Sequence, residues 1–238
     1  MTKVAIMQPT YLPWAGYFGL MMASDIFIFL DNVQFEKRGW QQRNQIKTPN
    51  GSIWLTVPIF SKGKRDQTIQ NTKINRDFEF SERHKKSIEL NYKKSQFFLN
   101  EYEKIFKLIN SNEIYLADLN IKLIKYFCKR LKIKTKIIRS KDLSSSGKKA
   151  ELLCSICQEL NADNYFSPPG SKDYLDASNT FRNAKIGLNY YYFNHPVYSQ
   201  LWGDFLPNMS VIDMIFNCGD ESINLIKNNV NTKNHIQD

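Results

Sequence analysis

KVAIMQPTYLPWAGYFGLMMASDIFIFLD, residues 3–31, contains two short runs, 4–7 and 26–30, in which every side chain is apolar. A strand that is apolar on both faces is typical of a parallel sheet covered by helices, because neither face meets water. Residues 15–23 lie between the two runs, and we expect them to be helical. The segment therefore predicts two buried strands of a parallel sheet joined by a helix.

The same alternation of strands and helices continues through the rest of the chain. Pro49-Asn50-Gly51 is a strong turn signal, and the residues on either side of it predict a β-hairpin from 42–46 and 53–59. Apolar residues recur at three- and four-residue steps from Leu116 to Leu131, which indicates an amphipathic helix. The other elements that we expect are strands at 67–75, 135–139, 164–166 and 186–193, and helices at 81–94, 97–110, 148–160, 209–217 and 221–229.

These patterns predict an α/β fold with a mainly parallel central sheet, helices on both faces and a β-hairpin excursion. The sequence contains no linker and no internal repeat, so we expect residues 1–227 to form a single α/β domain. We expect residues 228–238 to be a frayed C-terminal tail.

Composition excludes several classes of protein. Hydrophobic residues make up 42% of the chain and aromatic residues 13%, which excludes a disordered chain. Four cysteines in 238 residues do not form a disulfide scaffold. The sequence shows no export signal and no continuous apolar span, so we expect a cytoplasmic protein with no membrane span.

Polar clusters follow the ends of the expected strands. Because ligands of open α/β sheets bind beyond the carboxyl ends of the strands, these clusters predict one crevice that holds a small molecule. The clusters are residues 8–11, 31–34, 140–149, 167–171 and 194–196.

His195 and Asp31 are the candidate catalytic residues. His195 follows a stretch rich in aromatic side chains and is the histidine best placed for proton transfer near neutral pH. Asp31 follows a buried strand, where a carboxylate can orient a base or bind a hydroxyl group. The alternatives stay open that His195 is a structural histidine and that Asp31 only forms a turn.

Two loops are candidate anion-binding sites. Lys37, Arg38, Arg43 and Asn44 share a loop with Trp40, and forked donors of this kind suit phosphate or carboxylate groups. Residues 144–149, Ser-Ser-Ser-Gly-Lys-Lys, precede an expected helix, but they lack the spacing of a Walker loop. A solvated surface loop in the first case and a helix cap in the second are the alternatives.

Cys154 and Cys157 share a helical face with apolar neighbours, so we expect core residues and no metal site. Residues 121–149 carry eleven Lys or Arg and a single acid, Asp142, an excess equal to the net charge of +10 of the whole chain. This basic tract is either a solvated helix face with its loop or a patch for an anionic partner. Lysine outnumbers arginine 25 to 8, and a compositional bias toward Lys, Asn and Ile also explains the excess.

Eight segments, in this order, resemble the WbqC-like family. The first, KVAIMQPTYLPWAGYF, is the most specific, and the resemblance extends from about residue 2 to residue 220. The segments are residues 3–18, 29–34, 37–44, 55–58, 152–157, 198–200, 205–213 and 217–219.

The resemblance implies a setting among bacterial surface-polysaccharide genes, especially those for O-antigen. It also implies transfer of an amino-acid or other acyl group, glycine being the usual suggestion, to an amino sugar. We therefore expect an N-acyltransferase or aminoacyltransferase acting on a nucleotide-linked amino sugar. The side chains that we expect to bind substrate are Gln8, Tyr11, Trp14, Lys37, Arg38, Arg43, Asn44, Lys148, Ser167, Tyr174, Tyr198 and Gln200.

We expect no tightly bound cofactor. The co-substrate is an activated acyl donor, which is acyl carrier protein, coenzyme A or aminoacyl-tRNA, and residues 121–149 are the candidate docking site for an anionic macromolecular donor. Two other functions stay open: an ATP-using adenylate-forming or nucleotidyl-transferring enzyme, and a non-enzymatic binding module of a polysaccharide pathway.

Overall fold

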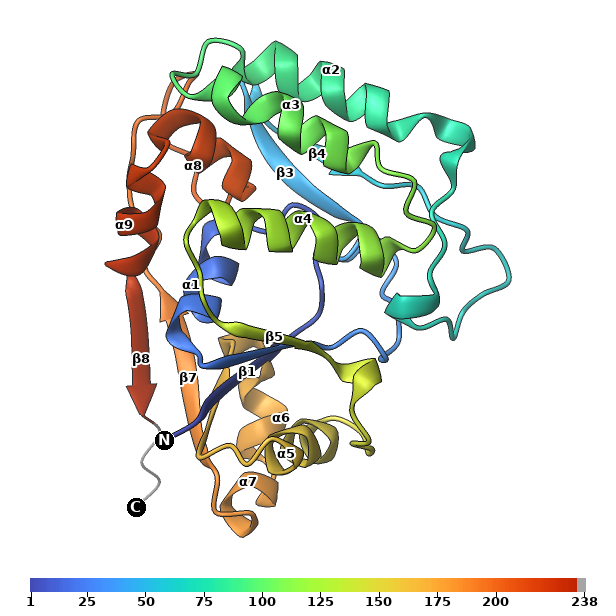
Figure 1. Cartoon of the computed structure of the whole chain (residues 1–238), viewed down its shortest axis with the longest axis vertical. Helices are drawn as coiled ribbons and strands as arrows, with labels where there is room; N and C mark the ends of the chain where they lie inside the picture. The colour runs from blue at the N-terminus through green and yellow to red at the C-terminus, as the bar shows by residue number, and fades with distance from the viewer. Residues whose placement is uncertain (235–238) are drawn as a thin grey trace.

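The computed structural model of the chain describes residues 1–234, and its centre is a six-stranded sheet of order β5-β2-β1-β6-β7-β8 (Figure 1). Neighbouring strands pair in parallel from β5 to β7, and β8 pairs antiparallel with β7. The strands are β1 (Lys3–Met7), β2 (Ile26–Phe29), β5 (Lys136–Arg139), β6 (Asn164–Ser167), β7 (Gly187–Phe193) and β8 (Val230–Asn234).

Helices cover both faces of this sheet. In Figure 1, α1, α4 and α9 lie on one side of the sheet, and α5, α6 and α7 lie on the other. The longer helices are α1 (Ala15–Ala23), α2 (Phe80–Tyr92), α3 (Phe98–Ile109), α4 (Leu116–Arg130) and α5 (Ala150–Glu159). The shorter helices are α6 (Lys172–Asp176), α7 (Thr180–Asn183), α8 (Val211–Cys218) and α9 (Glu221–Lys227).

The side chains of β1 show why this strand is apolar throughout. Ala5 packs in the hydrophobic cluster formed by α1, α4 and α8, whereas Val4 and Ile6 pack in the second cluster with α5. Both faces of β1 are therefore buried, which confirms the parallel, helix-covered sheet predicted from residues 3–31.

The order of the strands creates a switch point in the sheet. From β1 the chain moves to β2 and then β5 on one side, and it later returns to place β6 and β7 on the other side of β1. Numbered along the chain, the strands of this sheet follow the order 3-2-1-4-5-6 of doubly wound nucleotide-binding folds, here with the last strand antiparallel. The carboxyl ends of β1 and β6 are therefore the expected edge of a ligand crevice.

The predicted hairpin is present as a separate two-stranded sheet of β3 (Arg43–Thr48) and β4 (Gly51–Thr56). Thr48 pairs with Gly51, whose φ of 103° lies in the left-handed region that favours glycine. The fold class is thus confirmed, including the hairpin excursion.

Two expectations about individual segments are wrong. Residues 67–75 form a short 3₁₀ helix, Ile69–Asn71, and isolated bridges in place of a strand. Residues 230–234 are not frayed, because they pair with the open edge of β7 as β8. The polar sequence of β8 shows no strand pattern, and tertiary pairing decides its conformation. Residues 235–238 of the predicted tail lie outside the described residues, and the single domain of 1–227 stays a prediction.

Within residues 1–234, no helix is both long enough and apolar enough to cross a bilayer. Cys154 and Cys157 are both buried among the apolar side chains of α5 and its neighbours, which confirms them as core residues. The same part of the chain contains no group of three His, Cys, Asp or Glu side chains positioned to hold a metal ion.

Candidate functional site

Two adjoining cavities lie at the carboxyl ends of the parallel strands, and a third lies beside them between residues 34–37 and 61–67. Together we call the three cavities the cleft. The inner cavity, about 350 Å³, lies where β1 and β6 end, between Gln8 and Ser171. The loop cavity, about 740 Å³, extends from Gln8 to residues 145–149. The basic cavity, about 660 Å³, is lined by Lys37, Lys64 and Arg65 among others.

Shared lining residues join the three cavities into one cleft. The inner and loop cavities share Gln8 and Tyr174, and the inner and basic cavities share Glu36. The loop and basic cavities share Gln34. The cleft therefore lies at the switch point of the sheet. Four of the five polar clusters after the strands contribute to its lining, and residues 194–196 do not.

One wall of the loop cavity is the segment that leads into α5. Gly147 has φ 115° and Lys149 has φ 51°, so the chain turns sharply immediately before the helix begins. A Cβ atom on residue 147 would lie 3.1 Å from the backbone nitrogen of Leu152, which explains the glycine. Ser145, Ser146, Gly147, Lys148 and Lys149 all line this cavity. Lysine side chains and a helix amino terminus together favour an anion here.

Glu159, at the far end of α5, fixes the loop in this position. Its carboxylate accepts hydrogen bonds from the Ser144 backbone nitrogen, at 3.0 Å, and from the Ser145 hydroxyl. These two bonds lower the pKa of Glu159. The loop is thus anchored by a charge at the opposite end of the helix that it precedes.

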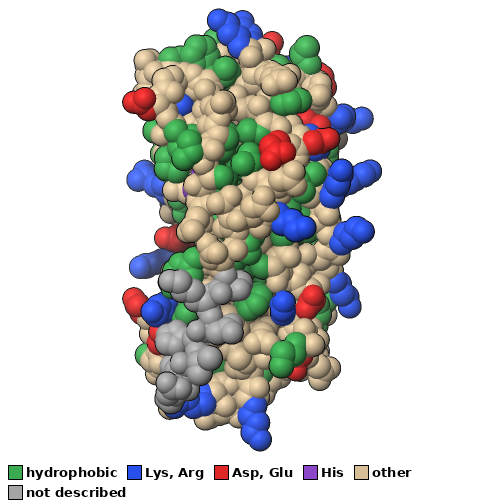
Figure 2. All heavy atoms as spheres, turned by 90° about the vertical axis from the view of Figure 1, so that its left-hand side faces the viewer, with side chains coloured by type: hydrophobic (Ala, Val, Ile, Leu, Met, Phe, Trp, Pro, Cys, Tyr) green, Lys and Arg blue, Asp and Glu red, His purple; other side chains and the backbone are tan. Residues whose placement is uncertain are grey.

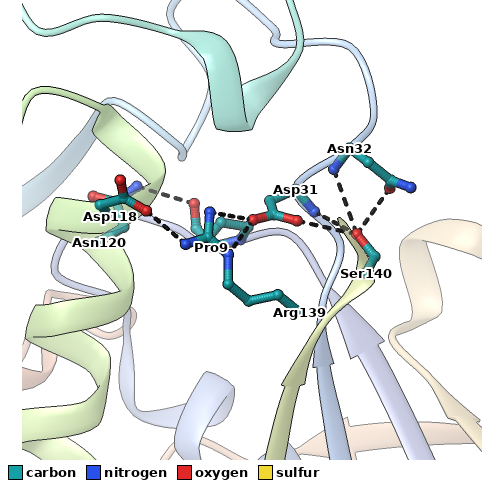
Figure 3. A network of polar contacts seen from close by, with 7 residues as sticks. All are labelled: Pro9, Asp31, Asn32, Asp118, Asn120, Arg139 and Ser140. Carbon is teal, nitrogen blue, oxygen red and sulfur yellow. Dashed lines mark hydrogen bonds and ion pairs between the residues drawn. The ribbon is translucent and has the colours of Figure 1, made fainter. Parts of the chain in front are cut away.

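Asp31 has no exposed surface and forms the centre of a buried polar network (Figure 3). Arg139 Nε and Nη2 both lie 2.6 Å from Asp31 Oδ2, and Arg139 Nη1 lies 2.6 Å from Asp118 Oδ1. Ser140 Oγ lies 3.1 Å from Asp31 Oδ1 and 2.8 Å from Asn32 Oδ1. Asn32 lines the loop cavity, whereas Asp31 is not among the residues that line it.

His195 lies in a packed aromatic cluster. Its ring stacks against Trp14 at 6.3 Å and Tyr198 at 6.0 Å, measured between ring centroids. Its Nδ1 donates to the carbonyl oxygen of Pro196 at 3.0 Å, which leaves Nε2 as the basic nitrogen. Burial lowers the pKa of His195, so the ring is neutral near pH 7.

This aromatic cluster does not line the cleft. Gln200 belongs to the same region and bonds to the Leu206 carbonyl oxygen at 2.9 Å and to Asp213 Oδ2 at 3.1 Å. The lining of the three cavities contains none of His195, Trp14, Tyr198 and Gln200. The predicted catalytic base therefore does not line the cleft.

Other predicted substrate-binding residues belong to the framework. Tyr11 is fully buried, with its hydroxyl 2.8 Å from His84 Nδ1, and burial lowers the pKa of His84 to about 4. Asn44 is buried and donates to the carbonyl oxygen of Leu12 at 2.7 Å. Ser167 has no exposed surface and bonds to Ser171, which lines the inner cavity.

The charged residues of the 37–44 loop disperse in the structure. Lys37 lines the basic cavity, whereas Arg38 is exposed and does not belong to the lining of the three cavities. The Arg43 guanidinium lies 4.1 Å above the ring of Trp54 on the hairpin. The structure thus brings Gln8, Tyr174 and Lys148 together in the cleft, with Lys37 at its edge.

Glu36 and Gln41 line the cleft although the sequence did not single them out. Glu36 is the only acid in the lining of the three cavities. Trp40, which the sequence placed in an anion-binding loop, lies beside Gln41 with 53% of its surface exposed. No local signal marks these residues, because they reach the cleft from an excursion loop and not from the end of a strand.

The basic tract of residues 121–149 is divided between several parts of the structure, and Lys125, Lys129, Lys132, Lys134 and Lys136 are exposed. Arg139 is held by the Asp31 network, Arg130 bonds to Glu101 and Asp220, and residues 148–149 lie in the cleft. Figure 2, which shows the face that carries α8, α9 and β8, has Lys and Arg side chains spread along its margins with acids among them. The exposed remainder of the tract on α4 is Lys125 and Lys129.

A family model described as the WbqC-like protein family matches residues 8–225 of the chain. The chain is also similar to the uncharacterized protein Rv1507c of Mycobacterium tuberculosis (strain ATCC 25618 / H37Rv), with 35% identity over 224 residues. That similarity covers 93% of this chain and 96% of the relative. No solved structure matches the chain.

Proposed function

The chain belongs to the WbqC-like protein family, and from that premise we propose that it is an N-acyltransferase or aminoacyltransferase acting on a nucleotide-linked amino sugar. The amino sugar, the role in O-antigen or surface-polysaccharide biosynthesis and glycine as the acyl group come from the family resemblance. The location of the site comes from the cleft.

The observation that carries the proposal is the position of the loop before α5. It places Gly147, Lys148 and Lys149 in a cavity that opens at the switch point of a 3-2-1-4-5-6 sheet. Lysines and backbone N–H groups at the start of a helix bind phosphate groups, and the switch point is where such sheets bind nucleotides. The combination supports binding of a nucleoside diphosphate in the loop cavity.

The inner cavity continues from the loop cavity and has the character of a sugar site. Trp40 and Tyr174 supply aromatic surface, and Gln8 and Ser171 supply hydrogen-bonding groups. Ligand pockets of a few hundred Å³ with aromatic walls and a few fixed polar groups suit a ring of this size. The sugar of a bound nucleotide sugar then lies toward Glu36.

Glu36 is the group that we assign to proton transfer, because it is the only carboxylate in the lining of the cleft. The sugar amine attacks the carbonyl carbon of the activated acyl group, and a C–N bond forms. The bond from that carbon to the donor's sulfur or oxygen breaks. Glu36 takes the proton that the amine loses and returns it to the leaving group. This assignment replaces His195, which lies outside the lining.

The basic cavity is the side from which the donor reaches Glu36. Lys37, Lys64 and Arg65 line it, and the cavity shares Glu36 with the inner cavity. Coenzyme A, acyl carrier protein and aminoacyl-tRNA all carry phosphate groups, which lysine and arginine attract. The two substrates would thus meet at Glu36 from opposite sides.

Calorimetric titration of nucleoside diphosphates against Lys148→Ala tests the location of the phosphates. We expect binding to weaken by about 10-fold, because a charge-assisted hydrogen bond contributes roughly 1.5–3 kcal/mol when it is desolvated. Lys141→Ala is the matched control, since Lys141 lies on the same segment but outside the cavity lining. Equal affinities for the two variants and the wild type would remove the loop from the site.

A further inference from the structure

We propose that Gln41 holds Gln8 as a hydrogen-bond donor and that, with Trp40, Gln8 forms the subsite for the sugar ring of the nucleotide sugar. This inference rests on the proposed function and assigns the sugar to the inner cavity and the phosphates to the loop cavity. Gln8 is the first residue after β1 and lines both cavities.

The orientation of the Gln8 side chain is set by a single contact. Gln41 Nε2 donates to Gln8 Oε1 at 2.6 Å, so the oxygen of the Gln8 amide is occupied from the protein side. Among the described residues, Gln8 Nε2 has no partner, and its two protons are left for a ligand in the cleft. The cleft therefore receives a donor, which recognises a hydroxyl or carbonyl oxygen of the ligand.

The backbone at Gln8 and Gln41 is held by hydrogen bonds from buried side chains. Asn120 has no exposed surface, and its Nδ2 donates to the carbonyl oxygen of Pro9 at 3.0 Å (Figure 3). The same Nδ2 donates to the carbonyl oxygen of Gln41 at 2.7 Å. Tyr17 donates its hydroxyl proton to the Gln8 carbonyl oxygen at 3.1 Å. One asparagine on α4 thus ties the loop after β1 to the loop that contains Gln41.

The Gln41 side chain donates to Gln8 while its own amide oxygen accepts no hydrogen bond from the described residues. Only 3% of its surface is exposed, and its Oε1 is buried with no hydrogen-bond partner among the described residues. A buried amide oxygen without a partner is costly, and proteins retain such groups where function requires them. The arrangement is explained if the donated bond to Gln8 is the purpose of this side chain.

Trp40 supplies the surface against which a sugar ring packs. It is 53% exposed, lines the inner cavity, and packs its ring against Trp54 at 5.3 Å between centroids. Its backbone carbonyl oxygen accepts a hydrogen bond from the Tyr11 nitrogen at 3.0 Å, so the exposed ring has a fixed base. An exposed aromatic face beside a fixed donor matches the C–H face and the oxygen atoms of a hexosamine.

The test compares nucleoside diphosphates with their hexosamine conjugates by calorimetric titration of the full chain, using uridine, thymidine and guanosine diphosphates as probes. The quantity measured is the affinity ratio of conjugate to diphosphate. We expect a ratio of about 10 or more for the wild type, and a ratio near 1 for Gln8→Met and Trp40→Ala. Trp40 lines the inner cavity and not the loop cavity, so Trp40→Ala should change diphosphate affinity less than about 2-fold. Phe78→Ala is the control, because Phe78 is 51% exposed and lies outside the cleft lining.

A double-mutant cycle separates positioning from general destabilisation. Gln41→Met alone should lower the ratio about 3-fold or more, but it should lower it no further when Gln8 is already methionine. Independent effects of the two changes would overturn the positioning role, and thermal melts of each variant verify that it is folded.

A wild type that binds diphosphates and gains nothing from the sugar would overturn this inference and leave the proposed nucleotide site standing. A wild type that binds neither kind of probe would overturn both.

Discussion

Asp31 and Arg139 form a buried ion pair in which two guanidinium nitrogens each lie 2.6 Å from one carboxylate oxygen. The pair joins the ends of β2 and β5 and holds Ser140 and Asn32 at the rim of the loop cavity. It explains why an aspartate follows a buried strand without contacting the cleft.

Substitution of Arg139 should lower the free energy of unfolding more than substitution of Asp31. Arg139→Met leaves Asp31 charged and without its partner in a fully buried site, and it should lower the free energy of unfolding by about 3–5 kcal/mol. Asp31→Asn should cost about 1–3 kcal/mol, because Arg139 keeps its bond to Asp118. Urea unfolding curves of both variants measure the difference, and an equal or reversed order would contradict the role assigned to Asp31.

The free energy of unfolding should depend on pH because the pKa of Asp213 is raised in the folded chain. Burial raises its pKa to about 7, although the charge of Lys47 and the hydrogen bonds from Gln200 and Asn217 oppose the shift. Between about pH 4 and pH 7 the folded chain holds a proton that the unfolded chain has lost. Its contribution to stability is therefore present at low pH and is lost as the pH rises through about 7, by up to about 1.4 kcal/mol per pH unit.

Asp213→Asn removes this titration. We expect the free energy of unfolding of the wild type, relative to that of the variant, to fall between pH 4 and pH 7 and to be constant above that range. Chemical denaturation at a series of pH values measures the difference, and parallel curves for the two proteins would exclude a titrating Asp213.

Lys125 and Lys129 test whether the exposed part of the basic tract docks a donor. Both side chains are exposed on α4, opposite the buried Leu123 and Phe127, so reversal to Glu should leave the fold intact. It should slow turnover with a macromolecular donor, and added salt should diminish the difference, because surface charges are screened over about 8 Å at physiological ionic strength. Turnover with a small donor should not change. Rates equal to wild type with every donor would show that the tract is a solvated surface.

Substitution of Glu36 should lower kcat, whereas substitution of His195 should not. Glu36→Gln should lower kcat about 100-fold or more, since a positioned proton acceptor contributes 10²–10⁴-fold, and it should leave nucleotide-sugar affinity nearly unchanged. His195→Phe keeps an aromatic ring in the cluster and should retain most of the activity. The reverse pattern, with loss of kcat in His195→Phe alone, would return the role of base to His195.

The sequence was sufficient to predict the strands and helices that are marked by the apolar pattern of their own residues. Residues 4–7 and 26–29 are apolar throughout because both faces of these strands are buried. The apolar residues of α4 from Leu116 onward recur at helical spacing, which predicts the helix. β8 could not be predicted, because its polar sequence is a strand only through its pairing with β7.

The same distinction applies to the site. Gln8 and Lys148 could be located because they follow expected strands, where an α/β sheet places its ligands. Gln41 could not, because its contact with Gln8 spans 33 positions and depends on Asn120 of α4. His195 follows the end of β7 and met the same sequence criterion as Gln8, yet its ring packs among aromatic side chains away from the cleft lining.

The most direct measurement of the central claim is mass spectrometry of a nucleotide-linked amino sugar incubated with the full chain and each activated acyl donor. We expect a product heavier by one acyl group with at least one donor, formed by the wild type and nearly absent with Glu36→Gln. Binding of the nucleotide sugar without any acylated product, across coenzyme A, carrier-protein and tRNA donors, would contradict it and indicate a binding module.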